Sequence, residues 1–466
     1  GRTNTYSLNL WITSDVDGNY SGQVFSGKLR VEVSQEKQKL AEVLLADSEN
    51  NINNDDPEQT FITGENPNNY IWYSGKLWRA VSIDPSDNSV KLVTEWDIST
   101  IPYDDDSNAF EGSHMEEWLN DSTVDGFLGN LREPEKFIKI DSKWNASQMN
   151  GSSKPPSESE GGTIVEDPVG LLNYYEFAMS YSGTSKENGY LNNGLIWWTL
   201  TPYNVSLIGI GSDGSTYGDA PKASRGIRPS INLKSNISIV SGTGTEENPY
   251  RLYGDNDINL QGSLLNTRYS GEYVQFGNNE NNLYRIVSHE NGTGTKIVSA
   301  EPLKSSREFI TSTFGSNVAF SSTNTIGTFL NGEYLTSYVD STYSDMIEDS
   351  TTWYLGTVNN GASYKLAKYI DEIMSSTTDA TTEAKVGLLR VGELMAGQFN
   401  SSYNNSNYWT LTPTNTYSIW TVHSQGYEYF PTYNNSLAIK PALNLKPNVV
   451  ITSGDGTLQN PFALAS

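Results

Sequence analysis

Side chains that could carry out catalysis are few in this 466-residue chain. It contains no cysteine, which excludes a thiolate nucleophile, a disulfide and a cysteine-ligated zinc site. Its three histidines, His114, His289 and His423, lie in unrelated sequence contexts, so neither a histidine-based triad nor a histidine-rich metal site is expected. No carboxylate pair stands out among the 55 acidic residues as the two catalytic groups of a glycosidase. The composition therefore favours a binding protein over an enzyme.

Oxygen-bearing side chains alternate in two short segments, as they do in calcium-binding loops. The segments are residues 15–19 (Asp-Val-Asp-Gly-Asn) and 255–257 (Asp-Asn-Asp). Neither is followed, at the required spacing, by a glutamate that would bind the ion through both of its oxygens. Asp-Gly-Asn is also ordinary turn chemistry. A turn is therefore the favoured interpretation, calcium binding is the alternative, and no other cofactor is expected.

Aromatic residues give the strongest indication of a binding surface. The chain has 28 tyrosines and 11 tryptophans, and rigid amphipathic rings supply contact area to a ligand at a low entropic cost. The candidate ligand-binding residues are Tyr417, Trp420, His423, Tyr427, Tyr429 and Tyr433, with Tyr203 and Tyr217 in the matching stretch of the first half. The alternative is that alternate aromatic residues here form the core-facing side of a strand.

The chain is built from two similar halves. Six blocks occur twice in the same order, roughly two hundred residues apart, which predicts a tandem duplication. The blocks are residues 77–82 and 283–288, 118–120 and 329–331, 169–177 and 386–394, 198–202 and 409–413, 227–233 and 439–445, and 241–250 and 453–462. We assign residues 57–253 to module 1, 254–267 to a polar connector and 268–466 to module 2.

Each module is expected to adopt an α+β fold with a curled antiparallel sheet. In module 1, alternation and β-branched or aromatic content predict strands, while apolar residues at helical spacing predict helices. The predicted strands are 69–73, 76–83, 89–95, 197–201, 207–210, 228–233, 237–240 and 250–252, and the predicted helices are 116–131 and 169–179.

Residues 1–56 are not repeated. Their pattern predicts two strands, 6–13 and 27–33, and a short helix over 35–48. Two strands cannot hold an independent sheet. This segment is therefore expected to be the tail of an upstream module, or to add its strands to another sheet.

Charge and hydropathy narrow the range of partners. The formal net charge of −25 opposes binding to the phosphates of a nucleic acid and to anionic membrane surfaces. No apolar run approaches the ~20 residues that a membrane span needs. We therefore expect neither nucleic-acid binding nor membrane insertion.

The order of the repeated blocks resembles a domain of unknown function found in surface proteins of Firmicutes and Bacilli. The resemblance is carried by the Trp-x-Leu-x-Pro blocks at 198–202 and 409–413, and by Ile227-Arg228-Pro229 and Ile439-Lys440-Pro441. That family is similar to the C-type-lectin-like fold, which includes the formylglycine-generating enzymes. The resemblance implies this fold and an extracellular, cell-surface location. Because those enzymes depend on cysteine, it does not imply their activity, and Lys440 in place of Arg228 argues against a catalytic role for that cation.

Two functions remain from these observations. We expect a bacterial cell-surface adhesin or recognition protein, whose variable loops bind a glycan or a protein of a host or bacterial surface. The alternative is a structural subunit of a pilus or surface filament that self-assembles by strand addition through residues 1–33.

Overall fold

The structure, a computed structural model, describes residues 37–149, 154–181, 188–289, 294–358, 381–391, 393 and 406–466. Residues Gly1–Lys37 and Gln38–Ser466 form separate units, and the fold described below is that of the second. The predicted strands 6–13 and 27–33 and the acidic segment 15–19 lie outside the described residues.

Strands rich in apolar residues form the centre of the first sheet. Strand β4 (Lys76–Ile83) contains Trp78, Ala80 and Val81, all of which are completely buried. A strand covered on both faces carries a nearly continuous apolar run instead of a strict alternation. Strands β3 (Tyr70–Tyr73) and β5 (Val90–Thr94) flank it in antiparallel register. These three strands confirm the prediction for residues 69–95.

The first sheet of module 1 has nine strands, in the order β15-β16-β3-β4-β5-β14-β9, with β2 paired to β4 and β1 to β2. Its other strands are β1 (Asn51–Asn53), β2 (Thr60–Thr63), β9 (Val169–Gly170), β14 (Ser230–Leu233), β15 (Ile239–Ser241) and β16 (Tyr250–Leu252). A second sheet follows the order β12-β11-β10-β13-β6. Its strands are β6 (Ser99–Pro102), β10 (Trp197–Tyr203), β11 (Ser206–Ile210), β12 (Thr216–Asp219) and β13 (Ser224–Ile227).

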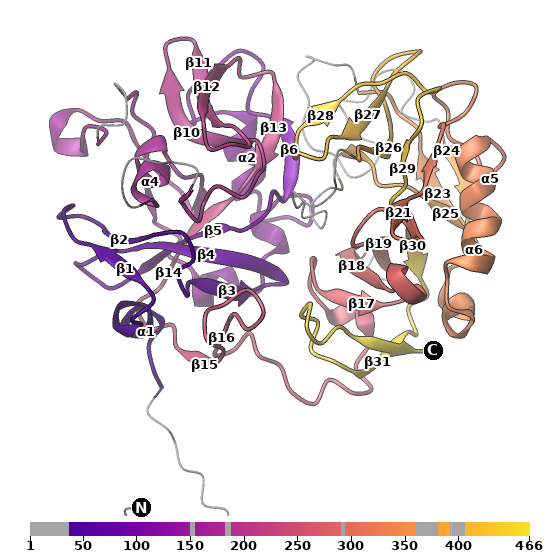
Figure 1. The fold of residues 1–466 in the computed structure, drawn as a ribbon, viewed down its shortest axis with the longest axis horizontal. Coiled ribbons are helices and arrows are strands. Elements are labelled where there is room, and N and C mark those ends of the chain that lie inside the picture. The colour runs from indigo at the N-terminus through magenta and orange to yellow at the C-terminus, as the bar shows by residue number, and fades with distance from the viewer. Residues whose placement is uncertain are drawn as a thin grey trace, which may run out of the picture. The chain divides into compact units, whose positions relative to one another are not determined.

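Module 2 repeats both strand orders. Its sheet β17-β18-β19-β30-β25 matches β3-β4-β5-β14-β9, and its sheet β22-β29-β26-β27-β28 matches β6-β13-β10-β11-β12 (Figure 1). The pair β26 and β29 is parallel, as is the pair β10 and β13. The bounds are β17 (Tyr273–Gln275), β18 (Leu283–Ser288), β19 (Thr295–Ser299), β22 (Thr311–Ser312), β25 (Val386–Gly387), β26 (Tyr408–Pro413), β27 (Ile419–Val422), β28 (Glu428–Tyr429), β29 (Leu437–Ala438) and β30 (Ala442–Leu445). Duplication of one module would produce this repetition.

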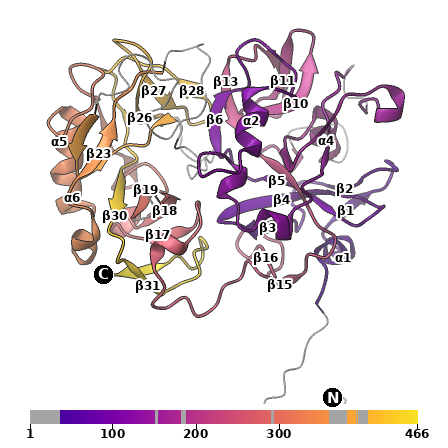
Figure 2. The same cartoon turned by 180° about the vertical axis from the view of Figure 1, so that it is seen from behind.

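The remaining elements are short. Four two-stranded pairs are β7 (Lys143–Asn145) with β8 (Ile164–Glu166), β20 (Lys304–Ser305) with β21 (Glu308–Phe309), β23 (Thr351–Tyr354) with β24 (Thr381–Ala384), and β31 (Val450–Ser453) with β32 (Ala463–Ala465). The helices are α1 (Leu40–Ala46), α2 (His114–Asn120), α3 (Pro134–Phe137), α4 (Tyr174–Met179), α5 (Thr325–Asn331) and α6 (Glu333–Ser337). All except α3 are labelled from opposite sides in Figures 1 and 2. The described residues thus form a strand-rich α+β fold with several sheets.

Both helix predictions within module 1 need correction at their boundaries. The region 116–131 holds α2 and, separately, a 3₁₀ turn at Leu128–Asn130. In the region 169–179, the first two residues form strand β9, and α4 begins only after Asn173, whose side chain accepts a hydrogen bond from the Glu176 N–H. Residues 169–170 form a strand by pairing with β14, and Gly170 lets the Trp144 ring pack on it, because a Cβ there would lie 2.3 Å from that ring. Gly387 has the same relation to Trp353, at 2.6 Å.

Residues before position 57 pack against module 1. Helix α1 confirms the helix predicted over 35–48, and its Leu40 and Leu44 are buried in the core. Strand β1 pairs antiparallel with β2. This part of the amino-terminal segment therefore adds strand β1 to the first sheet and packs helix α1 against the core of module 1.

Charged groups join the two modules at the connector. Arg132 contacts Asp257 at 2.7 Å and Asp255 at 3.4 Å, and Arg268 contacts the same Asp257 at 2.7 Å. The Asp255 carboxylate also accepts a hydrogen bond from the Ser74 N–H. The oxygens of the acidic segment 255–257 are therefore engaged by arginines and by a backbone N–H, which supports a turn there over a calcium loop.

We predict that the burial of Asp255 at this contact makes the protein less stable as the pH rises from about 4 to about 7. Burial raises the pKa of Asp255 from 3.8 to about 7; Glu272 also raises it, and Arg132 opposes the shift. Between these two values the folded state holds a proton that the unfolded state has lost, so the free energy of unfolding falls by up to about 4 kcal/mol as the pH rises through this window. Urea denaturation of Asp255→Asn should show a flatter pH dependence than the parent. Equal slopes for Asp255→Asn and the parent would contradict the assignment.

Candidate functional site

Two equivalent hairpins, β10–β11 and β26–β27, carry most of the predicted ligand-binding residues. Each hairpin contains a largely buried Trp-Thr-Leu-Thr-Pro sequence, and the same positions form equivalent hydrogen bonds in the two modules. The indole N–H groups of Trp198 and Trp409 donate to the carbonyls of Ile101 and Ser312. Thr199 and Thr410 donate across each hairpin to the carbonyls of Ile208 and Trp420, at 2.6 Å in both modules. These contacts make each hairpin a rigid support for its turn.

The turns of both hairpins present large side chains to solvent. In module 1, Tyr203 is 48% exposed and Val205 is 84% exposed. In module 2, Tyr417 is 66% exposed, and the Asn415 side chain fixes its backbone by accepting hydrogen bonds from the N–H groups of Tyr417 and Ser418. The structure therefore places Tyr203 and Tyr417 where a ligand can reach them.

Two further predicted residues lie close to the turn of module 2. The Tyr433 N–H donates to the Tyr417 carbonyl at 3.1 Å. Tyr429, on β28, is 49% exposed and lies opposite Thr421 of β27. Tyr417, Tyr429 and Tyr433 thus belong to adjoining strands and turns of one sheet, and we call them the turn tyrosines.

The prediction for Trp420 is wrong. This side chain is completely buried, and its indole N–H donates to the Val358 carbonyl at 2.8 Å. The Phe430 ring meets it edge-on, with ring centroids 4.5 Å apart. Both faces of β27 are covered, since all four of its residues are buried. Trp420 is a core residue, which was the alternative interpretation of the aromatic pattern.

His423, Tyr427 and Tyr217 contribute to the contact between the modules. The rings of His423 and Tyr427 are stacked at 4.2 Å. Arg225 of module 1 lies 5.9 Å from the ring centroid of Tyr217 and 5.5 Å from that of Tyr427. Burial lowers the pKa of His423 below its usual 6.5, so the imidazole is neutral near pH 7. These rings are half-buried in a seam between modules and lie apart from the exposed hairpin turns.

The loop that carries these residues is also anchored by polar contacts. Gln425 Nε2 donates to Ser212 Oγ at 2.8 Å, and the Gln425 carbonyl accepts from the Ile196 N–H at 2.8 Å. Glu428 is buried nearby, and desolvation raises the pKa of its carboxyl well above the usual 4.5. The variable stretch of module 2 therefore has two roles, since one part contacts module 1 and another faces solvent.

The cation of the Ile-Arg/Lys-Pro block is buried against an aromatic ring in both modules. Arg228 is completely buried, donates to the carbonyls of Thr94 and Leu191, and lies 4.8 Å from the ring centroid of Trp197. Lys440 lies 4.9 Å from the ring centroid of Tyr408, and burial lowers its pKa to about 7.

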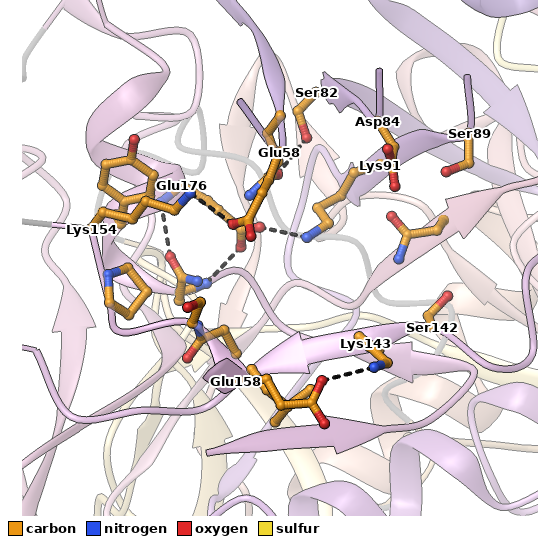
Figure 3. A pocket seen from close by; sticks show the side chains of 18 of the residues that line it. Glu58, Ser82, Asp84, Ser89, Lys91, Ser142, Lys143, Lys154, Glu158 and Glu176 are labelled. Carbon is orange, nitrogen blue, oxygen red and sulfur yellow. Dashed lines mark hydrogen bonds and ion pairs between the residues drawn. The ribbon is translucent and has the colours of Figure 1, made fainter. Parts of the chain in front are cut away.

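A polar cavity of about 400 Å³ lies in module 1, away from the hairpin turns (Figure 3). Its walls come from β4, β5, β14, the β7–β8 hairpin, the segment 154–158 and the start of α4. Lys91 Nζ contacts Glu176 Oε1 at 2.5 Å in its wall, while Lys154 with Glu58 and Lys143 with Glu158 form ion pairs around it. The sequence interpretation did not identify this cavity.

The buried pair of the cavity wall has a counterpart in module 2. Lys296 Nζ contacts Glu393 Oε1 at 2.6 Å, and the two side chains are 6% and 1% exposed. A tryptophan lies beside the lysine in each module, with Nζ 5.1 Å from the Trp144 ring centroid and 5.2 Å from that of Trp353. The sequence did contain a signal for this pair. A lysine occupies the same position in β5 and in β19, and a glutamate recurs in the blocks 169–177 and 386–394.

Metal-binding groups are not clustered in the part of the chain that the structure describes: no three or more His, Cys, Asp or Glu side chains there could hold an ion together. Within the same residues, no helix combines the length and the apolar character that crossing a bilayer requires. Comparison of the chain with family models, with curated proteins and with solved structures gives no match. The family suggested by the sequence blocks therefore stays a prediction.

Proposed function

We propose that the chain is a bacterial cell-surface recognition protein that binds a glycan or protein ligand through the turns of its two equivalent hairpins. The observation that carries the proposal is the exposure of these turns. The strands beneath them are buried and alike in both modules, whereas the turns expose Tyr203 and Val205 in one module and Tyr417 in the other. Recognition commonly resides in variable loops on a rigid scaffold.

The chemistry of the turn tyrosines suits this function. Each ring offers an apolar face and a hydroxyl, which together serve sugars and protein surfaces. Exposed aromatic side chains lower solubility, and the net charge of −25 offsets that effect. We further propose a C-type-lectin-like fold for each module and an extracellular location, on the basis of the repeated sequence blocks and the strand order that the modules share.

The proposal is tested by the binding of Tyr417→Ala to a glycan array and to immobilised mucin. We expect binding to weaken at least about tenfold, as truncation of an aromatic anchor at the centre of an interface does. Tyr253→Ala, which removes a 50% exposed tyrosine outside the hairpins, is the matched control and should bind like the parent. Periodate treatment of the mucin separates a glycan ligand from a protein ligand. Parent protein that binds neither surface, or equal binding by Tyr417→Ala, would refute the proposal.

A further inference from the structure

We infer that the polar cavity of module 1 is a binding site for a neutral sugar, separate from the hairpin turns. Figure 3 shows charged and hydroxyl side chains that point into one space from several strands and loops. Its volume of about 400 Å³ lies within the range of roughly 300–1,000 Å³ typical of small-molecule sites. The inference does not depend on the proposed role of the turn tyrosines.

The charges of the wall favour a ligand without net charge. Four lysines line the cavity, and each is paired: Lys91 with Glu176, Lys139 with Asp87, Lys143 with Glu158, and Lys154 with Asp56 and Glu58. The lining also contains five carboxylates, those of Glu58, Asp84, Asp141, Glu158 and Glu176. Three of these carboxylates, those of Glu58, Glu158 and Glu176, are already paired with lysines of the wall. The positive and negative charges of the wall therefore nearly balance, so neither an anionic nor a cationic ligand gains a large net attraction.

The hydrogen-bonding groups of the wall match a polyhydroxylated ligand. Besides the charged groups, the lining contains hydroxyls and amides, those of Gln59, Ser82, Ser89, Ser142, Asn145, Ser157, Asn173 and Asn232. A sugar hydroxyl both donates and accepts, and can therefore use ammonium, carboxylate, amide and hydroxyl partners at once. Hydrogen bonds to charged partners are the stronger ones. A wall this rich in both kinds of group fits a sugar better than an apolar molecule.

The wall is held in place before any ligand arrives. Asn173 and Glu176 form a reciprocal cap at the start of α4, which fixes the carboxylate that Lys91 contacts. The Tyr175 hydroxyl donates to Asp56, and its ring meets Phe61 edge-on at 5.8 Å, so the ring is fixed at the wall. Preorganised polar groups lower the entropic cost of binding a small ligand.

The most informative substitution in the cavity is at Asn232. It lies on β14 directly opposite Lys91 of β5, and cross-strand partners project from the same face of a sheet. Its side chain lines the cavity. Asn444 occupies the same position in module 2, opposite Lys296. An identical substitution at the two positions therefore separates a cavity effect from a general effect on the fold.

The experiment measures binding of glucose, galactose, mannose and N-acetylglucosamine by saturation-transfer NMR and calorimetry, with glucuronate and glucosamine as charged analogues. For a ligand of this size we expect at least one neutral sugar to bind with a Kd of about 1 mM, and the charged analogues to bind at least about tenfold more weakly. Asn232→Ala should weaken binding about three- to tenfold, as loss of one hydrogen bond does. Asn444→Ala should change it less than twofold.

A blocking variant completes the test. Asn232→Tyr places a ring in the cavity and should abolish sugar binding, while Tyr253→Ala, outside both the cavity and the hairpins, should bind sugar like the parent. Circular dichroism checks that each variant is folded, and Asn232→Ala alone decides the question if the tyrosine variant does not fold. The inference is overturned if no neutral sugar binds, if the charged analogues bind equally well, or if the two alanine variants behave alike.

Discussion

Replacing Trp420 with alanine is expected to lower the free energy of unfolding by about 3–5 kcal/mol, the range observed when a large buried aromatic side chain is truncated. Trp420 is completely buried, and the change removes its edge-on contact with Phe430 at 4.5 Å. It also leaves the Val358 carbonyl without the indole N–H that donates to it at 2.8 Å. Urea denaturation followed by circular dichroism measures the loss.

Two further variants, one at Tyr417 and one at Trp420 itself, serve as controls. Tyr417→Ala removes a ring that is 66% exposed, so its effect on stability should stay within about 0.5 kcal/mol. Trp420→Phe keeps most of the apolar volume but loses the indole N–H, and should fall between the parent and the alanine variant. A loss below about 1 kcal/mol for Trp420→Ala would show that the side chain is not part of the core.

The contrast between these two residues shows what the sequence could not decide. A core-facing strand near residue 420 was the alternative interpretation of the aromatic pattern, and a strand is present as β27. Alternation gives no indication of whether both faces of a strand are covered, and here all four residues are buried. Tyr417 is exposed because it lies in the turn before that strand. The burial of Trp420 could be recognised only from what packs on β27.

Contacts between distant segments account for the other differences. Tyr427 and Tyr217 were predicted to face a ligand, but both lie near Arg225, in a seam formed by segments about two hundred residues apart in the chain. Long-range packing of this kind leaves no local pattern. Strands β3, β4, β5, β10, β11, β14 and β16 were predictable because β-branched and aromatic residues alternate locally, and the repeat was predictable because its blocks retain their order. The short strands β6, β9, β12 and β13 were not predicted, and β6, β9 and β13 are defined by pairing with distant segments.

The buried lysine–glutamate pairs could be predicted from the sequence only in part. Asn232 and Asn444, and Glu176 and Glu393, belong to repeated blocks, so their recurrence is visible in the sequence. Lys91 and Lys296 recur on β5 and β19, where the neighbouring residues are mostly apolar. A charged residue retained in two apolar strands indicates a buried partner. Which acid that partner is depended on the tertiary structure.

Removing one member of such a pair should have an effect as large as that of Trp420→Ala. Lys296→Met leaves Glu393 buried at 1% exposure without its ammonium partner, and an uncompensated buried charge costs about 3–5 kcal/mol. The reason is that desolvation of the carboxylate persists after the attraction is lost. The matched control is Lys136→Met, which breaks an exposed pair with Glu133 and should cost at most about 1 kcal/mol.

A double-mutant cycle distinguishes the pair from simple packing. If the penalty comes from the unpaired carboxylate, Lys296→Met combined with Glu393→Gln should be more stable than Lys296→Met alone, because the second change removes the uncompensated charge. Additive losses would instead show that each side chain stabilises the fold through its own packing, for example the lysine stem against Trp353. Because Lys91 and Glu176 repeat the geometry at the cavity of module 1, the same cycle there reports how firmly the wall of the proposed sugar site is held.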